Sequence, residues 1–175
     1  KGSFSSQAGL RYDTRSIELT NSTFSKDFNA YSATLGVSKK GENQHIRLSY
    51  SSAFRTPHFS ELLANGVHHG TQRYEIGEVN LTSEKGNQLD LSYEWANQHL
   101  GLISNPYYHI ITDLIALNPL DSTINNYPVY RYEQEDKVSI KGDEMNLHFH
   151  SHLAHKLHIE ESITSLEGKN ENKFL

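Results

Sequence analysis

One unusually long segment, residues 55–86, gathers side chains that could bind a metal. It contains three histidines and two glutamates of interest: His58, His68, His69, Glu61 and Glu75. Neutral imidazole is a common ligand of zinc, copper and haem iron, and carboxylates also bind zinc. We therefore regard these five residues as candidates for capturing a metal ion or an axial position of haem. The alternative is that they are polar residues of a hydrated loop, held by hydrogen bonds.

A second group of histidines follows later in the chain: His148, His150, His152, His155 and His158. On a strand, His148 and His150 would share one face about 6.8 Å apart, so both imidazoles could approach one ion. The competing interpretation is a solvated rim next to a short turn. We treat His148 and His150 as a secondary candidate metal site.

The composition excludes several functional classes. The 175 residues include no cysteine, so neither a disulfide framework nor a thiolate metal site is possible. The formal net charge of −5 argues against nucleic-acid binding. No run of about eighteen apolar residues predicts a transmembrane helix. Because no Ser-His-Asp arrangement, glycine-rich phosphate loop or paired-carboxylate motif stands above background, we predict no enzyme and no resident cofactor.

The elements that must position these residues are strands. Apolar and polar residues alternate with a period of two, as in residues 29–38, and helical spacing is scarce. The class is therefore all-β. Seven strands are expected, at about residues 6–19, 29–38, 45–51, 89–95, 99–117, 129–150 and 156–166. Within the sixth strand the apolar phase slips near Gly142 and Asp143, which predicts a β-bulge there.

The connections between these strands alternate strictly in length. Short ones are expected at residues 40–43, 97–98 and 151–155, and long ones at residues 20–27, 55–86 and 118–128. In an antiparallel up-and-down meander this places all short turns on one rim, as in outer-membrane barrels. Runs of about ten residues also suit a strand that crosses a bilayer. We predict a transmembrane β-barrel wall with one row of side chains facing lipid and the other facing a wet lumen.

Seven strands cannot close a bacterial outer-membrane barrel, since single-chain barrels have an even number of strands starting at eight. An unclosed sheet would also leave two pairing edges exposed. We therefore expect residues 1–175 to be a fragment of the barrel domain of a larger protein.

Several separated motifs, in order, closely resemble the late barrel region of TonB-dependent outer-membrane receptors. The first set comprises Ser51, Ala53 to Pro57, Glu61, Leu62, Asn65, Gly66, His68, Tyr74 to Gly77, Asn80, Leu81 and Ser83 to Lys85. The second set comprises Tyr107 to Ile111, Leu114, Ile115 and Asp136 to Glu144. The resemblance spans nearly the whole chain.

This resemblance implies a partial barrel from a receptor of 22 strands with a plugged lumen, located in the bacterial outer membrane. It implies uptake of a metal or metal complex, such as zinc, haem or a ferric siderophore, energised through TonB. The plug domain and the TonB-contacting segment are absent from these residues. His68 occupies a position that belongs to the external loop in the zinc, haem and iron-chelate branch. Arg55, Glu75 and Glu84 resemble family positions that would brace this loop.

A second functional class stays open at this point. A soluble all-β module that recognises carbohydrate or protein would show the same alternation, dividing a core from solvent. The two classes differ in what the apolar row contacts: lipid in the receptor, and a second packed layer in the module.

Overall fold

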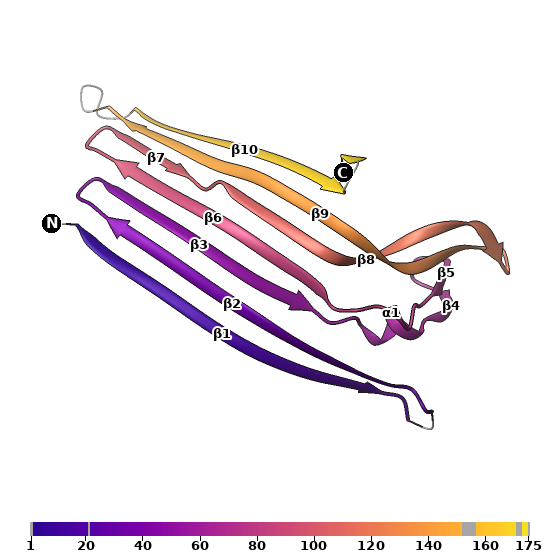
Figure 1. Cartoon of the computed structure of the whole chain (residues 1–175). Helices are drawn as coiled ribbons and strands as arrows, with labels where there is room; N and C mark the ends of the chain where they lie inside the picture. The colour runs from indigo at the N-terminus through magenta and orange to yellow at the C-terminus, as the bar shows by residue number, and fades with distance from the viewer. Residues whose placement is uncertain (1, 21, 152–156, 171–172, 175) are drawn as a thin grey trace.

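The computed structural model describes residues 2–20, 22–151, 157–170 and 173–174, nearly all of them in strands. The elements are β1 (Ser3–Glu18), β2 (Ser25–Lys40), β3 (Gln44–Arg55), α1 (Phe59–Leu63), β4 (Asn65–His68), β5 (Arg73–Ile76), β6 (Glu84–Ala96), β7 (Leu100–Ser104), β8 (Tyr107–Ile124), β9 (Tyr127–His150), β10 (His158–Asn170) and β11 (Lys173–Phe174). All belong to one sheet except α1, and Figure 1 shows the long strands side by side. Among the described residues, no helix is long and apolar enough to cross a membrane.

Antiparallel neighbours form the wall in chain order, and β7 and β8 together make one wall strand. Both pair with β9 in a single register from Leu100 to Leu120. The wall strand is interrupted between β7 and β8 near Pro106, which has no N–H to donate to a neighbouring strand. Its carbonyl still accepts a hydrogen bond from the Leu91 amide at 3.0 Å. With β1, β2, β3, β6, β9 and β10, this makes seven wall strands, and the predicted antiparallel meander is confirmed.

As predicted, the short connections lie at one end of the wall and the long loop lies at the other end (Figure 1). One end carries the turn closed by Gly41 N–H to Gln44 O at 2.7 Å and the turn closed by Asn97 N–H to Leu100 O at 2.8 Å. The opposite end carries the long segment between β3 and β6, with α1, β4 and β5 inside it. The two ends therefore differ in kind: one rim has brief turns and the other an ordered, elaborate loop.

Two of the three long loops expected from the sequence are shorter than predicted. The β1–β2 link spans residues 19–24, because β2 already begins at Ser25, and Leu19 N–H donates to Phe24 O at 3.2 Å. Residues 118–128 are mostly paired, because β8 and β9 continue beyond the wall as a hairpin. Its turn lies at Asn125 and Asn126, with φ of 51° and 67°. Asparagine tolerates this left-handed conformation, which a two-residue hairpin turn requires.

The β-bulge expected at Gly142 and Asp143 is also wrong. Both residues pair in an unbroken register with β10, opposite Leu166 and Ser165. The apolar phase changes for another reason: Val138 lies on the opposite face from Leu147 and is 3% exposed. The change of phase therefore reflects the burial of Val138 on its own face of the sheet and does not require the inserted residue of a bulge. The register shift in this part of the sheet lies in the hairpin extension, between Leu120 and Thr123.

The convex face of the wall carries an uncovered apolar band. Leu35, Leu48 and Leu91 are 57%, 43% and 38% exposed and lie on the same face of neighbouring strands. The band continues through further exposed residues on that face: Phe4, Leu10, Tyr12, Tyr31, Val37, Ile46, Tyr50, Leu89, Leu100, Tyr108, Leu147, Ile159 and Ile163. Among the described residues, no second layer covers it. The described residues thus form one sheet and not the two packed sheets of a sandwich, and the band lies on the face that a barrel wall would turn outward.

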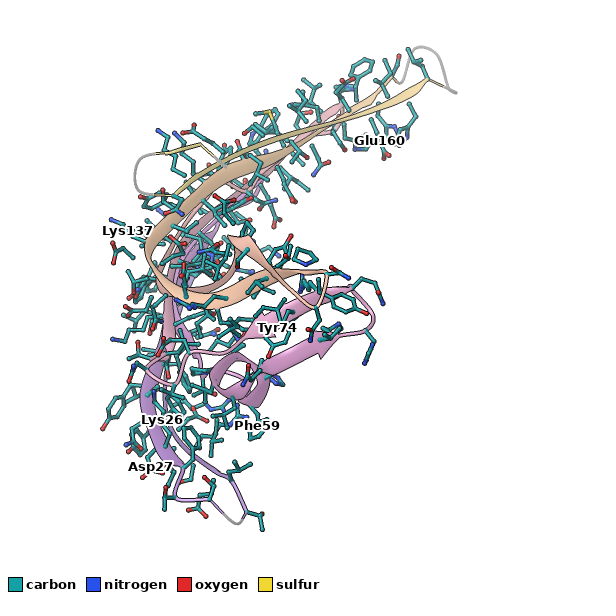
Figure 2. The ribbon with its side chains drawn as sticks, turned by 90° about the vertical axis from the view of Figure 1, so that its right-hand side faces the viewer. Lys26, Asp27, Phe59, Tyr74, Lys137 and Glu160 are labelled. Atoms are coloured by element: carbon teal, nitrogen blue, oxygen red, sulfur yellow. The ribbon has the colours of Figure 1, made fainter. Side chains whose placement is uncertain are left out.

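The long loop folds back onto the concave face of the wall, as the edge-on view in Figure 2 shows. Leu62 and Leu81 of the loop are each 1% exposed and pack with wall residues Ile17, Phe28 and Ile115. Strand β5 then pairs in parallel with β9 in the hairpin extension. The loop is therefore anchored by its own small apolar core and by the sheet.

Candidate functional site

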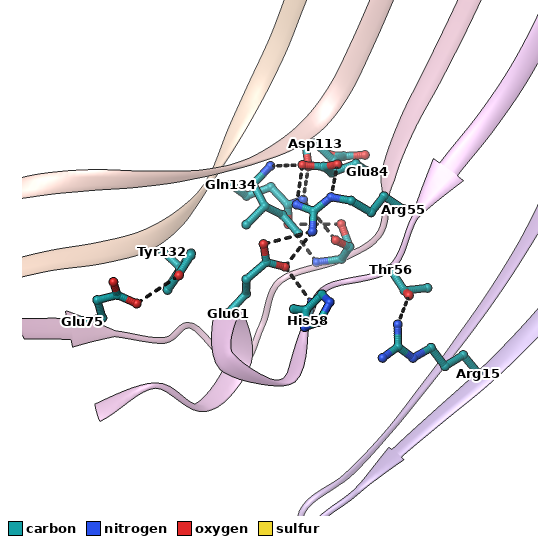
Figure 3. A network of polar contacts seen from close by, with 12 residues as sticks. Arg15, Arg55, Thr56, His58, Glu61, Glu75, Glu84, Asp113, Tyr132 and Gln134 are labelled. Carbon is teal, nitrogen blue, oxygen red and sulfur yellow. Dashed lines mark hydrogen bonds and ion pairs between the residues drawn. The ribbon is translucent and has the colours of Figure 1, made fainter. Parts of the chain in front are cut away.

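Arg55 is the centre of the polar network at the loop's base (Figure 3). It ends β3 directly opposite Glu84, the first residue of β6, so both side chains share the concave face. Arg55 Nε donates to Glu84 Oε2 at 2.6 Å and Nη2 donates to Oε1 at 2.8 Å. Its Nη1 also donates to the two carboxylate oxygens of Glu61, at 3.0 and 2.9 Å. One guanidinium thus connects two wall strands to helix α1.

The two glutamates extend this network to further segments. Glu84 is 9% exposed, and its Oε1 also accepts the Ile115 amide at 2.7 Å. Glu61 Oε2 accepts the His58 amide at 2.6 Å, which fixes the start of α1. The bonds therefore link β3, β6, β8 and the loop helix in one cluster.

The network shifts the ionisation of its members. Arg55 and Glu84 lie beyond the end of the apolar band, because the residues at the same height on the convex face include Lys85 and Lys137. The hydrogen bonds to Glu84 raise the pKa of Arg55 above its usual value. Burial acts to raise the pKa of Glu84, but the hydrogen bonds from Arg55 and from the Ile115 amide outweigh it and lower that pKa. Both groups are charged at neutral pH.

Glu75 forms a second anchor, between the loop and the hairpin extension. It is 6% exposed, and its Oε1 accepts Arg73 Nε at 2.8 Å. Its Oε2 accepts the Tyr132 hydroxyl at 3.1 Å (Figure 3). Burial and the charge of Glu75 raise the pKa of Tyr132. Of the three residues expected to brace the loop, Glu75 therefore pairs with its own strand neighbour, Arg73, and not with Arg55.

Sequence reasoning missed other residues that hold the loop. Lys26 Nζ donates to the carbonyl oxygens of Val79 at 2.5 Å and Leu81 at 2.8 Å. The Gln134 side chain accepts the Thr82 amide at 2.8 Å and donates to the Thr82 carbonyl at 3.2 Å. Their partners lie more than fifty residues away along the chain, so local patterns contain no signal for them.

The candidate histidines occupy two separate places on the loop. His58 precedes α1 and lines an open hollow of about 700 Å³ on the concave wall, together with Arg11, Arg15 and Arg55. His68 ends β4 and His69 follows it in the β4–β5 turn, where both are exposed. His68 Nδ1 lies 3.1 Å from the Thr71 hydroxyl.

The structure does not bring the five loop candidates together as a preformed metal centre. Both glutamates are engaged by arginines, Glu61 by Arg55 and Glu75 by Arg73. Within the described ranges, one group of three or more metal-binding side chains has converging ligand atoms, and it is His148, His150 and His158. A role for the loop histidines in capture therefore stays a prediction.

The secondary candidates His148 and His150 do lie close together near the short-turn rim. His158 of β10 joins them, because it pairs directly opposite His150. The sequence does predict this proximity: His148 and His150 are two residues apart on one strand, and His158 follows on the next strand after a short turn. His152 and His155, from the same group, lie outside the described residues.

Comparison with known proteins identifies the wall. Residues 1–165 match the family described as TonB dependent receptor-like, beta-barrel. None of the curated proteins matches the chain in sequence. The copper transporter OprC is a structural match, with a TM-score of 0.77, 15% identity, and coverage of 98% of this chain and 28% of OprC.

Two further solved structures share the fold. The FrpB iron transporter from Neisseria meningitidis (F3-3 variant) gives a TM-score of 0.67 at 15% identity, covering 98% of this chain and 25% of FrpB. A double mutant of the Serratia marcescens hemophore receptor HasR, in complex with HasA and heme, gives 0.62 at 12% identity, covering 93% and 29%. The chain thus spans less than a third of each of these three proteins. It belongs to the TonB-dependent receptor-like β-barrel family of the outer membrane, a family of receptors and transporters and not of enzymes.

Proposed function

We propose that the receptor containing this chain takes up a metal complex, and that the loop between β3 and β6 captures it at the outer rim. The observation that carries this proposal is the placement of the loop: it is fixed on the concave face and displays His68 and His69 on its exposed hairpin turn. A ligand entering the lumen from outside would pass these exposed imidazoles. The copper, iron and haem proteins that share the fold support the same class of cargo.

The arrangement favours a metal already held in a complex over a bare zinc ion. Zinc sites need three or four protein ligands around one ion, whereas the loop histidines and glutamates do not converge on one point. Haem iron needs a single axial imidazole, and a ferric chelate with an open position needs one ligand. The hollow beside His58 adds the guanidinium of Arg15, which suits the anionic oxygens of such complexes; that of Arg11 is paired with Asp13 of the same hollow.

Energy for uptake is proposed to come from the inner membrane through TonB, acting on a plug domain of the whole receptor. Residues 1–165 match the β-barrel family, and in this proposal the plug belongs to another part of the receptor. The convex band would contact outer-membrane lipid throughout transport. Uptake that proceeds equally well in cells lacking TonB would contradict this coupling.

Binding measurements on the full-length receptor test the capture step. Haem binding is followed by the absorption change on ligation, and zinc by metal analysis, for the parent and for the variant with His58, His68 and His69 all replaced by alanine. His109→Ala, on β8 outside the loop, is the matched control. We expect the triple variant to lose haem binding and the control to retain it. Equal haem and zinc uptake by the triple variant and the parent would contradict a role for these histidines.

A further inference from the structure

A cluster of three imidazoles lies on the concave face at the short-turn rim, at the opposite end of the wall from the loop. His148 and His150 are two residues apart on β9, and His158 pairs opposite His150 on β10. The ring centroids are 4.7 Å apart for His148 and His150, 4.4 Å for His148 and His158, and 4.5 Å for His150 and His158. One ring nitrogen of each lies within 4.8 Å of those of the other two.

One ring nitrogen of the cluster is not engaged by a hydrogen bond among the described residues. His148 Nε2 is buried and has no hydrogen-bond partner among the described residues. A buried polar atom without a partner is costly, and a bound cation would supply one. His158 Nε2 lies 2.9 Å from Glu160 Oε1, the arrangement in which a carboxylate orients an imidazole and leaves its other nitrogen to a metal.

We propose that His148, His150 and His158 form a binding site for a divalent transition-metal ion of the zinc type, with Glu160 as the carboxylate that orients His158. Nitrogen ligands select such ions over calcium and magnesium, which prefer oxygen. In a tetrahedral site with Zn–N bonds of about 2.1 Å, ligand nitrogens lie about 3.4 Å apart. Rotation of the side chains closes the remaining distance, because the paired β9 and β10 backbones already hold the three residues together.

The site is reachable from the lumen and lies where β9 and β10 meet the short turn. His148 borders an open hollow of about 360 Å³ that is also lined by His45 and Glu94. His158 and His150 are the last paired residues of the β9–β10 ladder before the turn. An ion bound there would cross-link the two strands at the rim that faces the periplasm in this family.

This site is independent of the capture proposed at the outer rim. It uses different residues at the other end of the wall and binds a bare ion through three nitrogens. Failure of the loop histidines to bind haem would leave it untouched, and its own failure would leave the loop proposal untouched.

Zinc titration of the full-length receptor in detergent, after treatment with a chelator, tests the proposal. The parent is compared with His148→Ala, His150→Ala and His158→Ala, and His109→Ala is the control. We expect each of the three substitutions to weaken zinc binding at this site at least about tenfold and the control to leave it unchanged. The parent, and not the variants, should also melt at a higher temperature with zinc, since a ligand of the native state stabilises it.

A spectroscopic measurement keeps the test valid if a variant fails to assemble. Cobalt replaces zinc in the parent receptor, and its visible absorption reports tetrahedral nitrogen ligation; His158→Gln, which keeps a polar side chain, should lose that signal. Heat-modifiable mobility on gels confirms that each receptor is folded. Zinc affinity and stoichiometry that are the same in the parent and in all three alanine variants would overturn the proposal, as would a cobalt spectrum showing oxygen ligands alone.

Discussion

Replacing Arg55 by alanine should release the loop between β3 and β6 while leaving the barrel wall assembled. The substitution removes two hydrogen bonds to Glu84, at 2.6 and 2.8 Å, and two to Glu61. Glu84 is 9% exposed, and within this network its charged carboxylate would then accept a hydrogen bond from the Ile115 amide alone. A buried charge that loses its partner is strongly destabilising, because it has neither water nor a counter-ion.

The size of the effect follows from the burial of the pair. Breaking a fully buried ion pair costs about 3–5 kcal/mol. The Arg55 side chain is 42% exposed, so solvent screens the interaction, and we expect about 2 kcal/mol. That energy corresponds to a roughly 30-fold increase in the population of the opened loop.

Hydrogen–deuterium exchange of the full-length receptor measures this directly. Amides of residues 58–84 should exchange roughly 30-fold faster in Arg55→Ala, while amides of β2 and β9 within the wall stay as slow as in the parent. Arg15→Ala is the matched control, because the Arg15 guanidinium donates a hydrogen bond to the exposed Thr56 hydroxyl at 2.8 Å and its loss should change little. Unchanged exchange of residues 58–84 in Arg55→Ala would refute the idea that this network holds the loop.

Three further predictions concern other parts of the structure. Leu48→Arg, in the convex band, should lower the free energy of unfolding of the receptor in liposomes by about 2–4 kcal/mol, as measured by urea titration. Ser49→Arg, on the concave face, should not lower it. Equal effects of the two substitutions would contradict the assignment of the faces. The pKa of Glu84 is lowered in the folded receptor. Its stabilisation of the loop should therefore be complete above the unfolded pKa of about 4.3 and be lost as pH falls through the lower folded pKa. In Glu84→Gln, exchange of the loop amides should lose this acid dependence, and a parent receptor that shows no acid dependence would count against the ion pair. Tyr132→Phe removes a hydrogen bond to the buried Glu75 carboxylate and should loosen β5 by about 1–2 kcal/mol, seen as faster exchange of residues 73–76; slower or unchanged exchange would show that this bond does not anchor β5.

The period-two alternation predicted the parts of the fold that depend on one strand at a time. Leu35, Leu48 and Leu91 face one side because side chains alternate along a strand, whichever strand is its neighbour. The seven wall strands and the two kinds of rim followed from the same pattern and from the spacing of turns.

The parts that were missed depend on distant residues or on turn chemistry. The Asn125–Asn126 pair contains a hairpin signal, but the composition of residues 118–128 around it is typical of a loop. The sequence predicts a bulge near Gly142 because the pattern of a single strand does not reveal that Val138 is buried on the concave face. At the site, the resemblance predicts that Arg55 and Glu84 brace the loop, whereas the engagement of Glu61 and Glu75 by arginines depends on how the loop folds back.

The most direct test of the account is the accessibility of spin labels along β3 in the full-length receptor reconstituted into lipid bilayers. Labels at residues 46, 48 and 50 should be accessible to oxygen dissolved in lipid, and labels at residues 47, 49 and 51 to a water-soluble paramagnetic reagent. This alternation is expected because Ile46, Leu48 and Tyr50 lie on the convex face. Reversed accessibility, or the same accessibility at all six positions, would contradict a wall that separates lipid from a wet lumen.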